Sequence, residues 1–196
     1  MVLKVLAIGD LSNNIVMFKK FTKSDIHLIN FPWDGPSKVI DIKDGVEFFK
    51  SVKVKDVLKR INEIKNEFDI CIAMSSTGLL MSYLADLNYI AYFCGHDIRS
   101  PPFIKDMPDP LSTDKPIYDF NSLERRYYKK AYDNAIAAVV TDDELLEHLK
   151  KYRDDPTRIT GYIVDTTIFN ENVKPVERKK TKFTFISPAR MGLQKG

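Results

Sequence analysis

The chain has 196 residues, of which 44% are apolar and 29% charged, and it carries a formal net charge of +3. This composition excludes an intrinsically disordered chain, a collagen-like repeat and a disulfide-rich scaffold, and at about 150 residues per domain the length predicts between one and two domains. Most of the surplus positive charge follows residue 170, so the main body is slightly acidic, which disfavours a nucleic-acid-binding face.

Short apolar runs alternate with segments of helical periodicity along residues 1–170. Strands are predicted at 2–10, 26–31, 38–42, 69–74, 89–94, 136–140 and 158–164. Helices are predicted at 13–21, 54–68, 77–87, 122–135 and 142–152. Thr141 and Glu144 have the spacing of a capping box for the last of these helices. The alternation predicts an α/β fold, a Rossmann-like doubly wound parallel sheet with helices on both faces.

The composition changes sharply after Asn170. Residues 1–170 are predicted to form one complete, amino-terminal Rossmann-like domain. Residues 171–181 are polar and aperiodic, which predicts a linker. Residues 182–196 contain one apolar strand and one loop, too little for a core. We expect them to be the first strand and loop of a second, incomplete domain, so that the chain is a fragment.

The two cysteines, Cys71 and Cys94, lie in apolar runs without a C-x-x-C partner, which favours buried free thiols and a cytoplasmic protein. No apolar run approaches the length of about 20 residues that a membrane-spanning helix needs. The chain contains no Asp-x-Asp and no His/Cys cluster at metal spacing, so no protein-held metal and no cofactor are expected.

The turn after the first predicted strand is a candidate binding site, because ligands of parallel sheets bind beyond the carboxyl ends of the strands. Gly9 allows a close backbone turn, and the start of the following helix offers N–H groups to an anion. Gly9, Asp10, Ser12 and Asn13 are therefore predicted to bind substrate. A tight turn capped by Ser12 or Asn13 is the alternative interpretation.

The segment Cys94-Gly95-His96-Asp97-Ile98-Arg99 is the second candidate, and it follows a predicted buried strand. A long proline-rich loop comes next, and long loops at this position commonly bind ligands. His96 is predicted to act as a base or to bond a sugar or phosphate, and Asp97 to orient it or to cap the loop. Gly95 and Arg99 are predicted to bind substrate. A structural turn around Asp97 with an exposed His96 is the alternative.

The helix at 122–135 mixes cations with tyrosines, which leaves two interpretations open. It is either a solvated face with aromatic packing on the other side, or a peripheral contact with a membrane headgroup or a phosphorylated acceptor.

In three stretches the chain resembles the amino-terminal half of a retaining, group-one glycosyltransferase of the GT-B fold. Residues 94–99 resemble the family's His-Gly-Ser-Asp-(Ile/Leu)-Arg segment, with Cys94 at the place of the family's histidine and His96 at the place of its serine. Residues 141–170 resemble a passage that ends in Asp-Thr-x-x-Phe, at Asp165 to Phe169. Residues 183–196 resemble the opening of the nucleotide-sugar domain.

The resemblance implies a metal-independent glycosyltransferase that moves a sugar from a nucleotide-sugar donor to an acceptor glycan, lipid or small molecule. It implies that Arg190 and Lys195 bind the donor diphosphate, and that His96 and Asp97 are catalytic. A chain without the donor domain is expected to be inactive alone. Two alternatives stay open: a non-catalytic Rossmann-like module that binds a nucleotide or metabolite, and a GT-B nucleotide-sugar epimerase.

Overall fold

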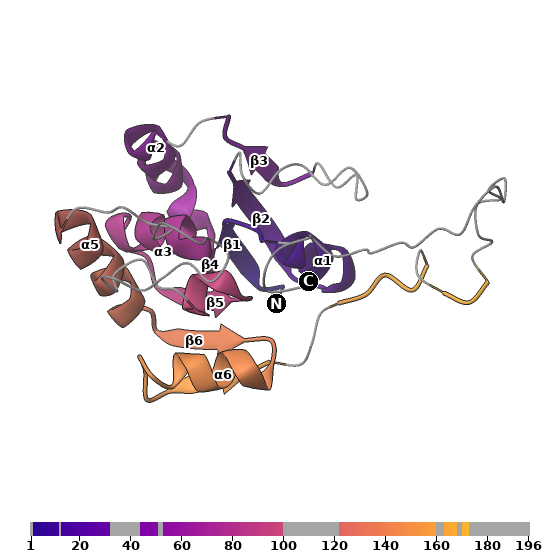
Figure 1. Cartoon of the computed structure of the whole chain (residues 1–196). Coiled ribbons are helices and arrows are strands. Elements are labelled where there is room, and N and C mark those ends of the chain that lie inside the picture. Colours follow the sequence, from indigo (N-terminus) through magenta and orange to yellow (C-terminus); the bar gives the residue numbers. More distant parts are fainter. Residues whose placement is uncertain are drawn as a thin grey trace, which may run out of the picture.

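The computed structural model describes residues 2–11, 13–31, 44–50, 53–99, 122–159, 163–167 and 170–172. In this part of the chain, seven parallel strands form one sheet in the order β3-β2-β1-β4-β5-β6-β7 (Figure 1). The strands are β1 (Lys4–Ile8), β2 (Asp25–Asn30), β3 (Val46–Phe48), β4 (Ile70–Met74), β5 (Tyr89–Phe93), β6 (Ala137–Val140) and β7 (Pro156–Arg158). The predicted α/β class with a doubly wound parallel sheet is confirmed.

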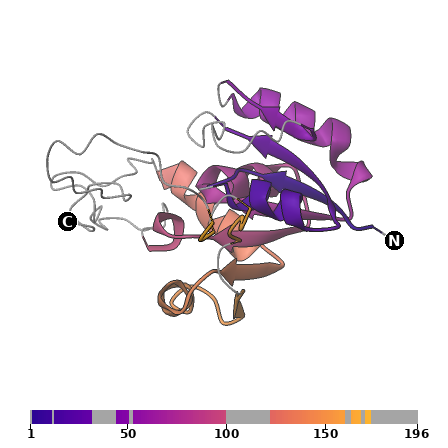
Figure 2. The ribbon, with the colours of Figure 1, turned by 90° about the vertical axis from the view of Figure 1, so that its right-hand side faces the viewer.

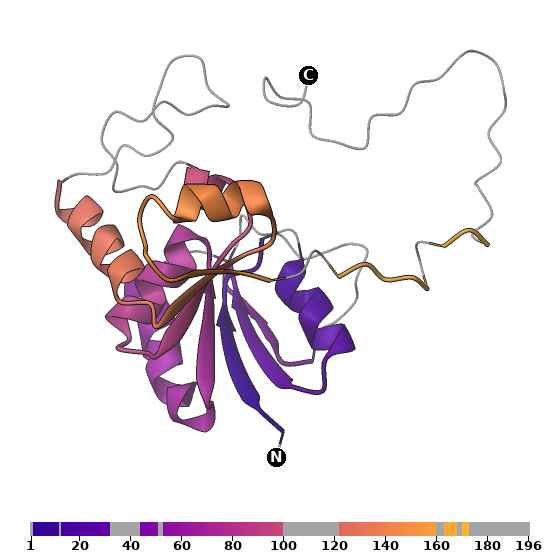
Figure 3. The ribbon, with the colours of Figure 1, turned by 90° about the horizontal axis from the view of Figure 1, so that it is seen from below.

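Helices lie on both faces of the sheet. They are α1 (Asn14–Phe21), α2 (Val54–Ile64), α3 (Ser75–Leu84), the single turn α4 (His96–Arg99), α5 (Ser122–Asp133) and α6 (Asp143–Leu149), with a 3-10 turn at Lys65–Glu67 after α2. Figure 3 shows α1 on one side of the strands and α5 on the other. In Figures 1 and 2, α2 and α6 lie toward opposite edges of the sheet.

Each face of the sheet has its own core, because side chains alternate along a strand. On one face, Leu6, Ile8 and Phe93 are fully buried and pack with residues of α2, α3, α5 and α6. On the other face, Val5 and Ala7 pack with residues of α1. At about 25 cal/mol for each Å² of apolar surface buried, these two layers supply most of the favourable free energy of folding.

The structure corrects three sequence predictions. The last strand runs from Pro156 to Arg158 instead of 158–164, because it pairs with only three residues of β6 and its length is set by that partner. The cap of α6 is Asp142 and not Thr141: its carboxylate accepts a hydrogen bond from the Leu145 N–H at 2.9 Å. The short strand β3 was not predicted, and the strand predicted at 38–42 lies outside the described residues.

A cluster of charges ties the edge strand β3 to its neighbours. Glu47 accepts a 2.8 Å hydrogen bond from Arg60 Nε on α2, and His27 Nε2 on β2 lies 2.8 Å from Glu47 Oε1. The hydrogen bond from Arg60 is the main cause that lowers the pKa of Glu47. Since Glu47 and Arg60 are only partly buried, solvent screens their attraction.

We expect Glu47→Gln to lower the free energy of unfolding by about 1 kcal/mol at neutral pH, because a neutral amide cannot accept both guanidinium hydrogen bonds. Urea unfolding measures the loss, and hydrogen exchange should show faster exchange in β3. Glu63→Gln is the control, since Glu63 pairs with Arg60 only at 3.4 Å and is more exposed. Equal stability of the two variants would contradict this role of Glu47.

Candidate functional site

The carboxyl ends of β1, β4 and β5 lie side by side and form the candidate site. Strand order reverses at β1, because β2 and β3 extend the sheet to one side of it and β4 to β7 extend it to the other. Such a reversal is where open parallel sheets bind ligands. The turns that follow β1, β4 and β5 contain Gly9, Ser75 and Gly95, respectively.

Gly9 brings the end of β1 into backbone contact with the end of β4. Its φ of +84° belongs to the left-handed region, and a Cβ at this position would lie 2.3 Å from the Met74 carbonyl oxygen. The Gly9 N–H donates to the Ile29 carbonyl at 2.8 Å. The predicted close turn is therefore present, and only glycine fits it. A substrate contact of Gly9 stays a prediction.

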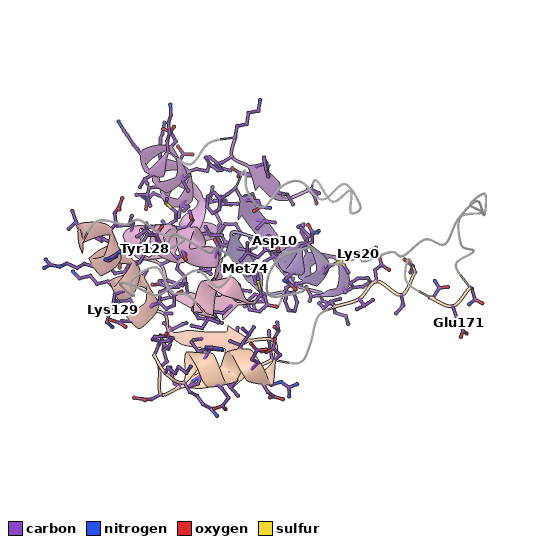
Figure 4. The ribbon with its side chains drawn as sticks, in the orientation of Figure 1. Asp10, Lys20, Met74, Tyr128, Lys129 and Glu171 are labelled. Carbon is purple, nitrogen blue, oxygen red and sulfur yellow. The ribbon has the colours of Figure 1, made fainter. Side chains whose placement is uncertain are left out.

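Asp10 is 1% exposed (Figure 4). Its side chain caps α1, although Asp10 precedes the N-cap residue, Asn13, by three positions. One carboxylate oxygen accepts from the Ile15 N–H at 3.0 Å and the other from the Val16 N–H at 3.1 Å. Burial raises the pKa of Asp10 to about 6. Two amides that were predicted to be open to an anion are thus engaged by the protein's own carboxylate.

The predicted capping alternative fails for Asn13. Asn13 has a φ of 59° and its side chain makes no capping hydrogen bond. Ser12 lies outside the described residues. The cap was misassigned because Asp10 reaches the helix across five and six residues, farther than the short spacing of an ordinary cap.

The β4–α3 turn is part of the site although no sequence pattern singled it out. Ser75 adopts a φ of 68° and is buried, and its Oγ accepts a 3.4 Å hydrogen bond from the Gly78 N–H. A Cβ on Gly78 would lie 2.2 Å from the Ile8 carbonyl oxygen, so the first turn of α3 rests directly on the end of β1. The run Ser-Ser-Thr-Gly after a buried strand was the available signal.

Asp97 holds the turn after β5. It is 4% exposed, and its Oδ1 accepts from the N–H groups of Cys94 at 3.3 Å and Gly95 at 3.0 Å. Burial raises the pKa of this carboxyl to about 6. The hydroxyl of Tyr132 donates to the Asp97 backbone carbonyl and ties the turn to α5. Asp97 therefore caps the loop, as one of its predicted roles requires.

The other predicted site residues are placed only in part. His96 and Arg99 lie on α4 by their backbone, and their side chains lie outside the described part of the structure. Arg190 and Lys195 lie outside it altogether. Catalysis by His96 and diphosphate binding by Arg190 and Lys195 stay predictions.

Asp165, one of the positions that carried the resemblance, fastens the segment 163–167 to α1. Its carboxylate, 2% exposed, pairs with Lys20, and it also accepts a 2.6 Å hydrogen bond from the Thr167 hydroxyl. The hydrogen bond from Lys20 is the main cause that lowers the pKa of Asp165 to about 2. Figure 4 shows Lys20 at the end of α1 that faces this segment.

Some tyrosines of α5 pack in the interior and one lies on the outer surface, where a membrane headgroup or a phosphorylated acceptor was the predicted alternative. Tyr128 and Tyr132 are buried, and Tyr132 stacks on Phe93 with ring centroids 5.3 Å apart. Tyr127 is 40% exposed, and Lys129 pairs with Asp133 at 2.8 Å on the outer surface. Aromatic packing therefore explains the inner face, and contact of the outer face with a headgroup stays a prediction.

A separate cavity of about 180 Å³ lies at the opposite edge of the sheet, at the amino end of β4, where Lys65, Asp69 and Asn88 line it. The Lys65 ammonium donates to the Ala85 carbonyl, and Asp69 accepts from the Lys4 N–H, so both charges already have partners. We place the site at the carboxyl edge, where parallel sheets bind ligands.

Among the described residues no group of His, Cys, Asp and Glu is arranged to hold a metal, and none of their helices has the length and apolarity to cross a membrane.

These features define a Rossmann-like α/β domain with its candidate site at the point where the strand order reverses. No protein-family model matches the chain, and no curated protein matches it. Among solved structures it is similar to a UDP-glucosyltransferase from Polygonum tinctorium that can glucosylate indoxyl. The TM-score is 0.54 at 9% identity, over 90% of this chain and 56% of that chain.

Two further structures give lower scores. UGT2 of Phytolacca americana, complexed with UDP-2-fluoro-glucose and pterostilbene, has a TM-score of 0.49 at 13% identity, over 86% of this chain and 56% of that one. UDP-N-acetylglucosamine 2-epimerase from Rickettsia bellii has a TM-score of 0.45 at 15% identity, over 77% of this chain and 42% of that one. The chain thus spans little more than half the length of the two plant proteins. At these identities the similarity to the Polygonum enzyme shows a shared fold and no more.

Proposed function

We propose that the chain is the acceptor-side domain of a glycosyltransferase that takes its sugar from a nucleotide-sugar donor. The observation that carries the proposal is the carboxyl edge of the sheet, where Gly9, the β4–α3 turn and the turn that Asp97 holds follow three adjacent strands beside the reversal of strand order. The shared fold with a UDP-glucosyltransferase over 90% of the chain supports it. The resemblance of residues 94–99, 141–170 and 183–196 favours the retaining, group-one type.

In the proposed transfer reaction the candidate site residues have distinct roles. A carboxyl group whose pKa lies near 6 is ionised at neutral pH and accepts a proton readily, which suits Asp97 to orient or deprotonate a group at the acceptor. His96 is the second candidate for proton transfer. Arg190 and Lys195 would neutralise the diphosphate as it leaves, the role for which a guanidinium and an ammonium are suited, without a metal.

The proposed acceptor of the sugar is a glycan, a lipid or a small molecule. The exposed face of α5 would bring the domain to a membrane if the acceptor is a lipid. Leu123 and Tyr127, 58% and 40% exposed, follow one stripe with Arg126 and Lys130. Each cation close to an anionic membrane contributes about 1 kcal/mol of attraction.

By itself the 196-residue chain is expected to bind nucleotide sugar weakly and to transfer none, because the resemblance assigns most donor contacts to a nucleotide-sugar domain that residues 1–170 do not include. Isothermal titration with UDP-glucose should give no saturable heat at 1 mM ligand, roughly the upper end of ordinary substrate affinities. Saturable binding, or transfer by the chain alone, would contradict this expectation.

The native protein tests the function itself. Its mass is compared with that of this chain, and it is then assayed with radiolabelled nucleotide sugars and a mixture of glycan, lipid and phenolic acceptors. We expect transfer, with Asp97→Asn lowering kcat by about 100-fold or more and Lys55→Gln, on the exposed surface of α2, leaving it unchanged. Epimerised sugar without transfer would replace the proposal by the epimerase alternative, and the absence of both reactions would leave a binding module.

A further inference from the structure

The cavity of about 180 Å³ at the amino edge of the sheet lies at the opposite ends of the strands from the candidate site. Leu6 and Cys71 contribute to its lining; both are buried, and the two residues pair with each other across β1 and β4. An apolar protein cavity of about 150 Å³ holds a benzene molecule, so a space of this size can hold a ligand of roughly six to eight non-hydrogen atoms. The cavity is therefore large enough for a second, separate binding site.

Charged side chains of both signs line this cavity. Lys65 belongs to the 3-10 turn that follows α2, Asp86 comes two residues after the end of α3, and Asp69 directly precedes β4. Helices α2 and α3 contact each other, and each leads to the amino end of the next strand, so both end at this edge of the sheet (Figure 1). One ammonium group and two carboxylates thus surround one small space.

Each of these three groups can form further hydrogen bonds. The Lys65 ammonium has three N–H groups and donates one of them to the Ala85 carbonyl at 2.8 Å. Asp69 accepts from the Lys4 N–H at 2.8 Å with Oδ2, so its Oδ1 can accept from a ligand. The side chain of Asp86 is exposed. Among the described residues no ion pair joins Lys65 to either aspartate, so the opposite charges line the cavity without neutralising each other.

A ligand that carries both signs of charge on neighbouring atoms matches this arrangement. A simple anion would be attracted by Lys65 but repelled by the two aspartates, and a simple cation would meet the reverse. An α-amino acid has an ammonium and a carboxylate on the same carbon, so it can bridge protein charges of opposite sign that do not contact each other. Leu6 and Leu87 in the lining offer apolar surface to a small side chain.

We propose that the cavity at the amino edge binds a small α-amino acid. Lys65 holds the carboxylate of the ligand, and Asp69 and Asp86 hold its ammonium group. The site goes beyond the proposed transfer reaction, because it uses none of the residues at the carboxyl edge and needs no nucleotide sugar. It assigns a binding role to three charged residues that no sequence pattern singled out.

The test is a titration of the 196-residue chain with L-alanine, L-serine and L-valine up to about 50 mM, followed by amide NMR shifts. We expect at least one of them to give saturable shifts at the amides of Asn66 and Asn88, which line the cavity. The amides of Gly9 and Gly95, at the carboxyl edge, should not shift. Propionate and ethylammonium each carry only one of the two charges, and at the same ionic strength they should bind at least about fivefold more weakly.

Two variants test the charges separately. Lys65→Met removes the ammonium and keeps an apolar stem, and Asp86→Asn removes one carboxylate. Each should weaken binding of the amino acid by about fivefold, because solvent screens charges at the mouth of the cavity. Asparagine tolerates the φ of 54° at position 86, so Asp86→Asn is expected to fold. Lys59→Met and Asp56→Asn are the matched controls, since both residues are exposed on α2 outside the lining, and should bind as the parent does.

The absence of saturable shifts with all three amino acids overturns the site, as do shifts confined to Gly9 and Gly95. Equal affinity for ethylammonium or for propionate overturns it in favour of a simple cation or anion site, and equal affinity of the parent and Asp86→Asn overturns the role of the charges. If Lys65→Met does not fold, Asp86→Asn decides. The measurement involves no sugar transfer, so amino-acid binding by a protein whose native form is inactive would refute the transferase and leave this site standing.

Discussion

Gly78→Ala is expected to lower the free energy of unfolding by about 3 kcal/mol, although alanine is the better helix former. The new Cβ would lie 2.2 Å from the Ile8 carbonyl oxygen and 3.1 Å from its carbon. Both atoms are backbone of β1, an interior strand of the sheet, and cannot turn away, so α3 must lift off β1. The separation would loosen Leu79 and Met81, which belong to the core between α3 and the sheet.

Thermal unfolding measures this loss, which at about 2–4 °C for each kcal/mol corresponds to a Tm lower by about 10 °C. Gly45→Ala is the control, because the nearest atom to its added Cβ is the Lys19 Nζ at 2.9 Å, the end of a flexible side chain. The φ of +62° at Gly45 still costs about 1 kcal/mol. A Gly78→Ala protein that melts within 2 °C of the parent, roughly the effect of half a kcal/mol, would show that α3 does not rest on β1 as described.

The second large effect is that the free energy of unfolding falls as the pH rises from about 4 to about 6. Burial raises the pKa of Asp10 and of Asp97 from an ordinary value of 3.8 to about 6. Between these values the folded protein holds two protons that the unfolded chain has released, so stability falls as the pH rises. A shift of two pKa units corresponds to about 3 kcal/mol for each carboxyl group.

The other shifted carboxyl groups act outside this window. The pKa values of Glu47 and Asp165 are lowered, so their contribution is lost only as the pH falls below about 4. Urea unfolding at half-unit steps from pH 4.5 to 7.5 is expected to show the decline. Asp10→Asn should reduce the slope to about half, because one titrating group is removed. A profile that is flat in the parent, or equally steep in Asp10→Asn, would contradict the burial of this charge.

Helices and strands whose apolar residues recur with a regular period could be predicted from the sequence. The stripe of α2 has Val57, Ile61 and Ile64 in the core, as its spacing indicates. Strand β3 could not be found this way, because it is only three residues long and is fixed by pairing with β2 and by the Glu47–Arg60 contact. Its existence depends on tertiary partners that have no local pattern.

The candidate site could be predicted only as far as its turns follow strands. Gly9 and Asp97 were expected to matter, and each holds a turn at the carboxyl edge. The β4–α3 turn was missed because its importance depends on the close approach of Gly78 to the Ile8 carbonyl, a property of the packing between α3 and β1 and not of residue type. The role of Asp10 was missed for a related reason, since its contacts depend on how the turn closes.

The cap that Asp10 places on α1 has a consequence for how a ligand would be received. In many phosphate-binding turns the ligand itself orders the loop, and the lost conformational freedom weakens binding. Here the Ile15 and Val16 amides are already held by an internal carboxylate, so the turn has its shape before any ligand arrives. Preorganisation of this kind removes that cost, so this turn would bind its ligand more tightly than a loop that the ligand has to order first.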